Sequence, residues 1–413
     1  MPQPVGGAGA GRAKPRYDLP GLRVAVVNWR DPWHPSAGGA EQYAWQMASG
    51  LLARGARVWY LTARAAGQPR RDRRDGVQFV RTGSRLSVYP RVLGWLALHR
   101  RAFDVVIDCQ NGIPFFTPWV LPRRVPVLCV MHHVHDAQFG VHFSPVMAAV
   151  GRLLEGPVAR WTYRRHDCVA VSESTVSAMR DRLHWAGPIA IVPNGLAADC
   201  FDRPERGKRR QRDCGGADPG QPEVLVLTWV GRLVAHKRVE RVLGIAERLG
   251  DGAIVEVIGR GPAGAALAAG VLARGLTGRV RLRGFLSEAD KRAVVAGSLL
   301  HLNTSQGEGW GLCVLEAAAL GVPTVAYDVD GLRDAVRDGE TGWLVRGGQS
   351  IEDVTERAVK ELSDPARRAE IAAACREWAS QFSWDASVSL MAALITRAVR
   401  RRTGSGGLLA DDD

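Results

Sequence analysis

The sequence contains, at its most informative point, Ser305-Gln306-Gly307-Glu308-Gly309-Trp310-Gly311-Leu312-Cys313-Val314-Leu315-Glu316. This stretch lies between an apolar run at Leu299–Asn303, which predicts a buried strand, and a helical pattern over Gly311–Leu320. Its three alternating glycines let the backbone turn tightly and bring N–H groups close to a ligand. Because the N-terminus of the following helix adds partial positive charge, the stretch predicts a site for an anion such as phosphate.

Glu308 and Glu316 bracket most of this stretch. At the rise of a helix they would be about 12 Å apart along the axis and within roughly a quarter turn of each other. Two acceptors so placed suit hydroxyl groups at opposite ends of one extended ligand. The alternative is a plain loop followed by a surface helix with solvated glutamates. The clustered glycines and the apolar neighbours of Glu316 favour the ligand site.

Around this stretch, short β-branched runs alternate with amphipathic segments from Leu22 to Val192 and again from Val224 to Tyr327. The alternation predicts an α/β fold with two doubly wound, Rossmann-like domains and a cleft between the ends of their strands. A basic segment rich in glycine and proline separates the two halves. The predicted parts are a disordered tail (1–20), a first domain (21–202), a linker (203–222), a second domain (223–382), a helix packing back on the first domain (383–402) and a flexible tail (403–413).

Composition bounds the class of protein. The chain has 413 residues, of which 46% are hydrophobic and 23% charged, and this composition indicates a soluble globular protein. No apolar run approaches the ~20 residues that span a bilayer, and the basic N-terminal segment lacks the apolar core of a signal peptide. The seven cysteines are scattered without a C-x-x-C pair, which favours reduced thiols in a cytoplasm over disulfides or a zinc site.

The positive charge is concentrated in the first half of the chain. Residues 1–222 hold 31 Lys or Arg and 17 Asp or Glu, a net charge of +14, whereas the remainder has a net charge of −1. The two domains are therefore expected to face different partners. Since 50 of the 55 basic residues are arginine, genomic composition alone is an alternative explanation. Basicity by itself is weak support for a nucleic acid or a membrane as partner.

Two further segments follow predicted strands and are expected at the cleft. Arg232 and Lys237 lie just after the strand at Val224–Val230, where together they are suited to neutralise a diphosphate without a metal ion. Gly38-Gly39 precedes the helix that starts near Ala40, and Glu41 in its first turn either faces the cleft or complements the helix dipole.

A histidine cluster follows the strand at Val125–Met131. His132, His133 and His135, with Asp136, suggest a metal site at first sight. The spacing at a strand end scatters such side chains in different directions, so hydrogen bonding in the cleft or ordinary loop roles are favoured over metal binding.

Taken together, these motifs resemble the retaining glycosyltransferases of family 4 (glycosyl transferases group 1), which have the two-domain GT-B fold. The resemblance spans roughly Leu22 to Val399, and the pair Glu308/Glu316 is similar to the family's E-x7-E signature. The matching segments are Gly38–Glu41, Val171–Ser174, Val192–Gly195, Gly231–Leu233 with Lys237, Gly307–Gly311 with Glu316, Gly339–Val345 and Phe382–Trp384.

The resemblance implies a metal-independent transfer of a hexosyl group from a nucleoside-diphosphate sugar, with retained configuration and no cofactor. The acceptor stays open between a lipid carrier, a glycan and a small natural product. No nucleic acid is expected, and contact of the basic domain with the inner face of a membrane is one possibility. The implied site residues are Glu308 and His132 in catalysis, Gly39, Arg232, Lys237, Leu312, Cys313 and Glu316 for the donor, and Gly38, Glu41 and His133 on the acceptor side.

Two alternatives remain at this stage. Gly259, Gly261 and Gly264 match the dinucleotide fingerprint G-x-G-x-x-G, and the arginines of Val280–Arg283 would suit the 2′-phosphate of NADP, so an oxidoreductase is the first. The second is a non-enzymatic binder of RNA or anionic membrane through the Trp-bearing helical segment at Val92–Arg101, whose apolar stripe is explained equally well by core packing.

Overall fold

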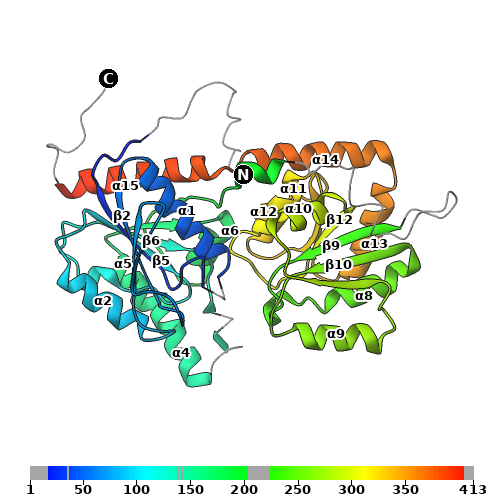
Figure 1. Ribbon diagram of the computed structural model, residues 1–413, viewed down its shortest axis with the longest axis horizontal. Coiled ribbons are helices and arrows are strands. Elements are labelled where there is room, and N and C mark those ends of the chain that lie inside the picture. Colours follow the sequence, from blue (N-terminus) through cyan, green and yellow to red (C-terminus); the bar gives the residue numbers. More distant parts are fainter. Residues whose placement is uncertain (1–16, 35–36, 137–138, 141–143, 203–223, 404–413) are drawn as a thin grey trace.

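In the computed structural model, two α/β domains lie side by side (Figure 1). The structure describes residues 17–34, 37–136, 139–140, 144–202 and 224–403. Each domain is built around a mainly parallel sheet with helices on both faces, as the alternation of apolar runs and amphipathic segments predicts. The predicted fold class is confirmed.

The first sheet has the strand order β3-β4-β2-β1-β5-β6-β7-β8. Its strands pair in parallel except β3, which runs antiparallel to β4. The central strands are buried along their whole length, because helices cover both faces of the sheet. The strand bounds are β1 (Arg23–Val27), β2 (Arg57–Thr62), β3 (Arg71–Arg74), β4 (Val77–Arg81), β5 (Val105–Gln110), β6 (Val127–Met131), β7 (Asp167–Ala170) and β8 (Ile189–Ile191).

The helices of the first domain connect these strands. The helical stretch from Pro145 to Tyr163 is interrupted by a π-helical turn at Leu154–Val158, which contains Pro157. A proline inside a helix removes one backbone hydrogen bond and breaks the regular ladder. The helices are α1 (Gly39–Ala53), α2 (Val88–Leu98), α4 (Pro145–Leu153), α5 (Ala159–Tyr163) and α6 (Glu173–Asp181).

The second sheet has the order β11-β10-β9-β12-β13-β14, and all its pairs are parallel. Its strands are β9 (Leu225–Val230), β10 (Ala253–Ile258), β11 (Val280–Gly284), β12 (Leu300–Asn303), β13 (Thr324–Tyr327) and β14 (Gly342–Val345). The helices are α8 (Arg241–Leu249), α9 (Gly264–Ala273), α10 (Glu288–Ala296), α11 (Leu312–Ala319), α12 (Leu332–Ala335), α13 (Ile351–Leu362) and α14 (Pro365–Ser380).

The last helix, α15 (Trp384–Thr403), leaves the second domain and lies along α1 of the first (Figure 1). The two helices approach so closely that a methyl group on Gly50 would lie 2.4 Å from Val388 Cγ2. Arg54 Nη2 donates to Asp385 Oδ1 at 2.9 Å and to Ser389 Oγ at 2.7 Å. The chain therefore joins its two domains both through the 203–223 segment and through this returning helix.

Several predictions made from sequence concern the ends of the chain. Residues 1–16, 203–223 and 404–413 lie outside the described residues, so most of the predicted tails and the linker cannot be compared. Leu19 was placed in the disordered tail, and this part of the prediction is wrong: its side chain is fully buried and its N–H donates to Arg54 O at 2.7 Å. Within the described part of the chain, no helix is long and apolar enough to cross a membrane.

Candidate active site

The loops at the carboxyl ends of both sheets meet between the two domains. A methyl group on Gly309 would lie 2.3 Å from the backbone oxygen of His132, and one on Gly307 would lie 3.4 Å from the ring of His133. These contacts place the segment after β12 directly against the segment after β6. The glycines are required here because any side chain at Gly309 would collide with backbone of the other domain.

Lys237 and Glu308 form an ion pair at this junction. Lys237 comes from the short helical turn after β9, and Glu308 from the loop after β12. Ser305 Oγ donates to the same carboxylate oxygen of Glu308 at 2.7 Å. Burial disfavours the charged form, but the charge of Lys237 and the hydrogen bonds from Lys237 and Ser305 outweigh it and hold the pKa of Glu308 below its usual range. Glu308 is therefore an anion at neutral pH.

Glu316 lies in the middle of α11 and has a different partner. Lys291 Nζ of α10 donates to Glu316 Oε2 at 3.0 Å and contacts Glu288 at 2.7 Å. Burial raises the pKa of Glu316, with small additions from the charges of Glu288 and Asp199, and Lys291 offsets only part of this rise. These residues line a small cleft together with Cys200, Val230, Arg292, Val295, Cys313, Ala317 and Leu320.

The helix α11 begins only at Leu312, after Gly311 in the left-handed region at φ +79°. Glu308 is therefore outside the helix, and the predicted separation of about 12 Å along one axis does not apply. The N–H groups of Leu312 and Cys313 belong to the first turn and have no partner within the helix ladder. Gly39 is the first residue of α1, so its N–H group is likewise free of the helix ladder. Both helix starts lie at the junction, as predicted for an anion site.

Arg232 lies across the junction, close to the start of α1. Its Nη2 would be 3.6 Å from a methyl group on Gly38, and a carboxylate oxygen of Glu41 would be equally close. Glu41 Oε2 accepts a hydrogen bond from Gly38 N at 2.7 Å, so it caps its own helix. Burial raises the pKa of Glu41, while the positive charges of Arg30 and Arg232 oppose this. Glu41 therefore lies where it complements the start of its own helix, one of the two roles expected for it, and it also lies near Arg232 of the other domain.

The three histidines after β6 have distinct surroundings. His132 is buried with its ring edge-on to Tyr43, at 5.0 Å between centroids, and its Nε2 has no hydrogen-bond partner in the described residues. Burial lowers the pKa of His132 to about 3, so the ring is neutral at physiological pH. His133 is shifted to about 3 in the same way. The ring of His135 lies against that of His133, with centroids 5.2 Å apart, and its backbone N–H donates to Glu155 Oε1 at 2.7 Å.

Among the described residues, no group of three or more His, Cys, Asp or Glu side chains is placed to hold a metal ion. The segment Asp328–Asp330 resembles a D-x-D motif, but both carboxylates pair with Arg333. The segment is a loop at the end of β13.

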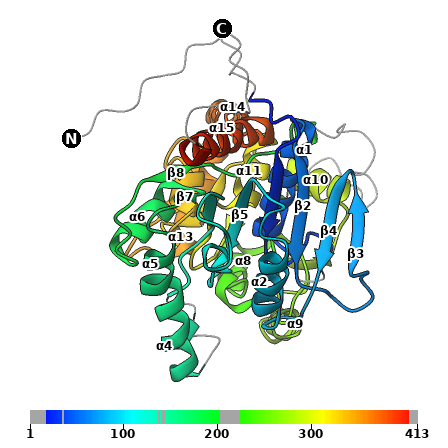
Figure 2. The ribbon, with the colours of Figure 1, turned by 90° about the vertical axis from the view of Figure 1, so that its left-hand side faces the viewer.

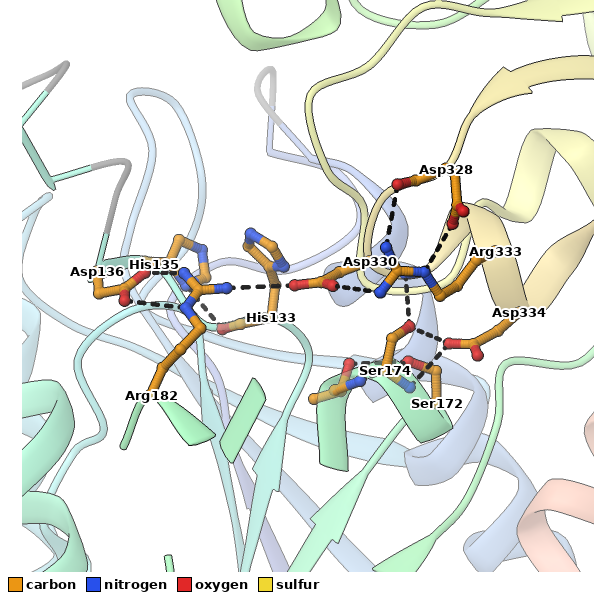
Figure 3. A network of polar contacts seen from close by, with 12 residues as sticks. His133, His135, Asp136, Ser172, Ser174, Arg182, Asp328, Asp330, Arg333 and Asp334 are labelled. Atoms are coloured by element: carbon orange, nitrogen blue, oxygen red, sulfur yellow. Dashed lines mark hydrogen bonds and ion pairs between the residues drawn. The ribbon is translucent and has the colours of Figure 1, made fainter. Parts of the chain in front are cut away.

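A polar network not anticipated from the sequence joins the two domains beside the site (Figure 3). Ser174 at the start of α6 donates through its N–H to Asp334 Oδ2 at 3.0 Å and accepts from Gly331 N at 2.8 Å. Next to it, Arg182 contacts Asp136 of its own domain and Asp330 of the other, the latter at 3.2 Å. Ser174 belongs to one of the segments that matched the family, which was the available signal, but no role was assigned to it.

The glycines of the dinucleotide fingerprint have a structural explanation. Methyl groups on Gly259 and Gly261 would lie 1.8 Å from Gly231 O and 2.3 Å from Leu233 O, and one on Gly264 would lie 3.3 Å from the side chain of Leu233. The space in front of these glycines is therefore filled by the loop that carries Arg232. The fingerprint is a packing feature, and it gives no support to the oxidoreductase alternative.

The apolar stripe expected to serve a basic binder is likewise part of the core. Val92 and Leu96 of α2 are fully buried, and Trp95 packs against His99 and Phe103. Of the two explanations for the apolar stripe of Val92–Arg101, core packing holds for Val92 and Leu96, whereas Leu98 is 85% exposed.

Two family models match the chain. "Glycosyltransferase Family 4" matches residues 37–199, and "Glycosyl transferases group 1" matches residues 217–378. The two matches cover the two domains in turn. The chain belongs to the glycosyl transferases group 1. The predicted family and transferase class are thereby confirmed.

Individual relatives agree with this assignment. The chain is 32% identical over 290 residues to the D-inositol 3-phosphate glycosyltransferase of Rhodococcus erythropolis, which covers 64% of each chain. It thus spans just under two thirds of the length of that relative. Among solved structures, sucrose-phosphate synthase of Thermosynechococcus elongatus has a TM-score of 0.73 at 19% identity and covers 91% of this chain and 98% of its own.

The Anabaena protein Alr3699/HepE, solved in complex with UDP and glucose, has a TM-score of 0.69 at 19% identity and covers 91% of this chain and 100% of its own. At this identity the likeness concerns the fold, and it confirms the predicted GT-B arrangement of this group 1 glycosyltransferase.

The structure gathers Arg232, Lys237 and Glu308 of the second domain with Gly38, His132 and His133 of the first.

Two residues of the site were missed from the sequence. Ser305 and Lys291 each bond one of the paired glutamates, Ser305 to Glu308 and Lys291 to Glu316. Lys291 is one of only five lysines in the chain, and the same rarity that drew attention to Lys237 was a usable signal. Nothing in the local sequence distinguishes Ser305 from other loop serines.

Proposed function

We propose that this group 1 glycosyltransferase moves a hexosyl group from a nucleoside-diphosphate sugar to an acceptor hydroxyl, with retention of configuration and without a metal ion. The observation that supports this most is the ion pair Lys237–Glu308 beside the first turn of α11. The same loop packs against His132 of the other domain through Gly309. A cation and a helix N-terminus suit a departing diphosphate, and the adjacent anion suits the hydroxyl groups of a sugar.

The reaction breaks the bond between the anomeric carbon and the diphosphate oxygen and forms a bond from that carbon to the acceptor oxygen. The acceptor proton passes to the departing diphosphate, on which negative charge builds up. Fixed cations stabilise this charge more in the transition state than in the ground state. We assign this role to Arg232 and Lys237, assisted by the N–H groups of Leu312, Cys313 and Gly39.

The carboxylates contact the donor at its two ends. When the diphosphate binds, Lys237 exchanges Glu308 for a phosphate oxygen, and Glu308 then accepts hydrogen bonds from the sugar hydroxyls. His132 faces the sugar as a neutral ring, for which its unpartnered Nε2 and its pKa of about 3 provide the basis. Glu316 accepts hydrogen bonds from the ribose hydroxyls.

The acceptor enters from the first domain, past Gly38, Glu41 and His133. The relative from Rhodococcus is named for D-inositol 3-phosphate, and the Anabaena neighbour was solved with UDP and glucose. These names make a hydroxyl-rich acceptor and a UDP-sugar the first compounds to examine.

The proposal is tested by incubating the protein with UDP-, GDP- and ADP-sugars and candidate acceptors in the presence of EDTA. We expect release of one nucleoside diphosphate with matching product, whose anomeric configuration by NMR equals that of the donor. Turnover that requires added divalent metal, or an inverted product, contradicts the corresponding part of the proposal.

A pair of variants links this activity to the site. Glu308→Gln removes the charge but preserves the shape, and we expect turnover to fall by about 10²–10³-fold while the protein stays folded. Glu352→Gln, on the surface helix α13, changes the net charge equally and is expected to leave turnover unchanged. Equal turnover in both variants would remove Glu308 from the catalytic machinery.

A further inference from the structure

The helix α4 and the start of α5 present large apolar side chains to solvent. Val146, Met147, Val150, Leu153 and Trp161 are between 41% and 73% exposed. Positions 146, 150 and 153 follow the spacing of one helix face, so they form a continuous stripe. We call these five side chains the apolar ridge. Figure 2 shows that α4 projects away from the body of the first domain.

The side of α4 that faces the protein carries small residues instead. Ala148 and Gly151 are buried, and a methyl group on Gly151 would lie 2.8 Å from the ring of Phe139. The polarity of this helix is therefore the reverse of that of an ordinary surface helix, whose large apolar side chains face the core. A contiguous exposed apolar face of this kind marks an interaction surface.

The charges around the apolar ridge have a single sign. Arg152, Arg160, Arg164 and Arg165 lie in or next to these helices, and Arg164 lies over the ring of Trp161 at 4.6 Å. The only acidic residue between 145 and 165 is Glu155, which is fully buried and accepts a hydrogen bond from His135 N. The surface next to the apolar side chains is thus positive.

We propose that the apolar ridge docks onto an anionic lipid bilayer. Aliphatic side chains enter the boundary between headgroups and acyl chains, Trp161 lies at the headgroup level, and the arginines contact lipid phosphates. A projecting apolar surface surrounded by positive charge is complementary to the negatively charged headgroups of a fluid bilayer. The docking rests on these side chains alone and does not depend on the transferase activity.

The location of the apolar ridge connects it with the active site. The segment from His132 to Asp136 leads toward α4, and Arg152 Nε of α4 donates to Asp136 O at 3.0 Å. A docked bilayer would therefore lie on the acceptor side of the junction. If the proposed function holds, the acceptor class that fits this geometry is a lipid-anchored hydroxyl compound.

The test is co-sedimentation of the full-length protein with vesicles of phosphatidylglycerol and, separately, of phosphatidylcholine. We expect binding to phosphatidylglycerol that weakens with added salt, and little binding to phosphatidylcholine. The triple variant Val146→Ser/Val150→Ser/Leu153→Ser is expected to weaken binding by about ten-fold or more. The control is Leu272→Ser on α9, which changes a leucine that is 70% exposed in the other domain.

The outcomes separate the possible occupants. Absence of binding to phosphatidylglycerol, or equal binding by the triple variant, overturns the proposal. A wild-type dimer without lipid that the triple variant abolishes would assign the ridge to a second copy of the chain instead. Brominated lipid is expected to quench tryptophan fluorescence of the wild type, and this quenching should be lost in Trp161→Phe. The readout reports the contact of Trp161 with lipid directly and does not depend on the stability of the variant. Turnover of a water-soluble acceptor is expected to be unchanged in all these variants, so failure of docking is distinguishable from failure of the proposed function.

Discussion

Glu308 and Glu316 stand eight residues apart, and the structure gives them opposite properties. Each is largely buried and each contacts one lysine. Glu308 has Lys237 to itself and also accepts from Ser305, so its pKa falls in spite of burial. Glu316 shares Lys291 with Glu288, so burial prevails and its pKa rises. The residue is glutamate at both positions, and the donors directed at its carboxyl group decide whether its pKa falls or rises.

This difference suits the two ends of a nucleotide sugar. A carboxylate held as an anion next to the reacting carbon stabilises positive charge that develops on the sugar ring. A carboxyl group that ionises less readily contributes hydrogen bonds to neutral hydroxyls, for which its charge matters less. The predictions below alter one donor or one carboxyl group at a time, from the largest expected effect to the smallest.

Removing the lysine partner of Glu308 should have the largest effect. In Lys237→Ala we expect kcat to fall by about 10²–10³-fold, because the departing diphosphate loses a fixed cation. The effect of burial on Glu308 is then opposed by Ser305 and the nearby His236 without Lys237, so the pKa of Glu308 should rise. A depressed carboxyl pKa contributes stability that is present above the unfolded-state pKa and is lost as the pH falls through the folded-state pKa. In the variant the folded-state and unfolded-state pKa values lie closer together, so acidification should cost less stability than in the wild type.

The measurement for Lys237→Ala is steady-state turnover together with thermal unfolding from pH 4 to pH 8. Lys360→Ala, an exposed lysine on α13, serves as the control and should change neither quantity. An unfolding profile that stays parallel to the wild type across this range would show that Lys237 does not set the charge of Glu308.

Neutralising Glu316 should act mainly on binding. In Glu316→Gln we expect the Kd for the free nucleoside diphosphate to rise about 10–100-fold, since hydrogen bonds from ribose hydroxyls to a carboxylate are lost. The Glu308→Gln variant should bind the same nucleotide nearly as well as the wild type, because the proposed contact of Glu308 is with the sugar alone. Calorimetric titration measures both values. If the two variants lose the same affinity, the division of labour between the carboxylates is wrong.

The sequence predicted the fold well where strands are apolar. The segment Leu299–Asn303 was predicted as a buried strand, and β12 spans Leu300–Asn303, because a short apolar run between polar segments has few alternatives. The strand β3, Arg71–Arg74, was not predicted. Its four residues are all charged, and an antiparallel edge strand with no face in the core has no apolar alternation to detect.

The site was predictable in its residues more than in its contacts. The spacing of the glycines predicted a ligand site in the loop after β12. In the structure, a side chain at Gly309 would collide with the backbone of His132, which lies 177 positions earlier in the chain. The bond between Ser174 and Asp334 likewise joins residues 160 positions apart. Such pairs depend on how two domains meet, and no local pattern of residues encodes that.

The smallest effect is expected from the second donor to Glu308. Ser305→Ala removes one hydrogen bond of 2.7 Å, worth about 1 kcal/mol, and should lower kcat at neutral pH by no more than about ten-fold. With one donor fewer, the pKa of Glu308 should rise, so the acidic limb of the kcat profile should move to higher pH while Lys237 still keeps the carboxylate ionised at neutrality. Ser363→Ala, an exposed serine after α13, provides the matched control. An acidic limb that moves in both variants or in neither would mean that the neighbours of Glu308 do not govern its charge during turnover, and the contrast with Glu316 would lose its functional meaning.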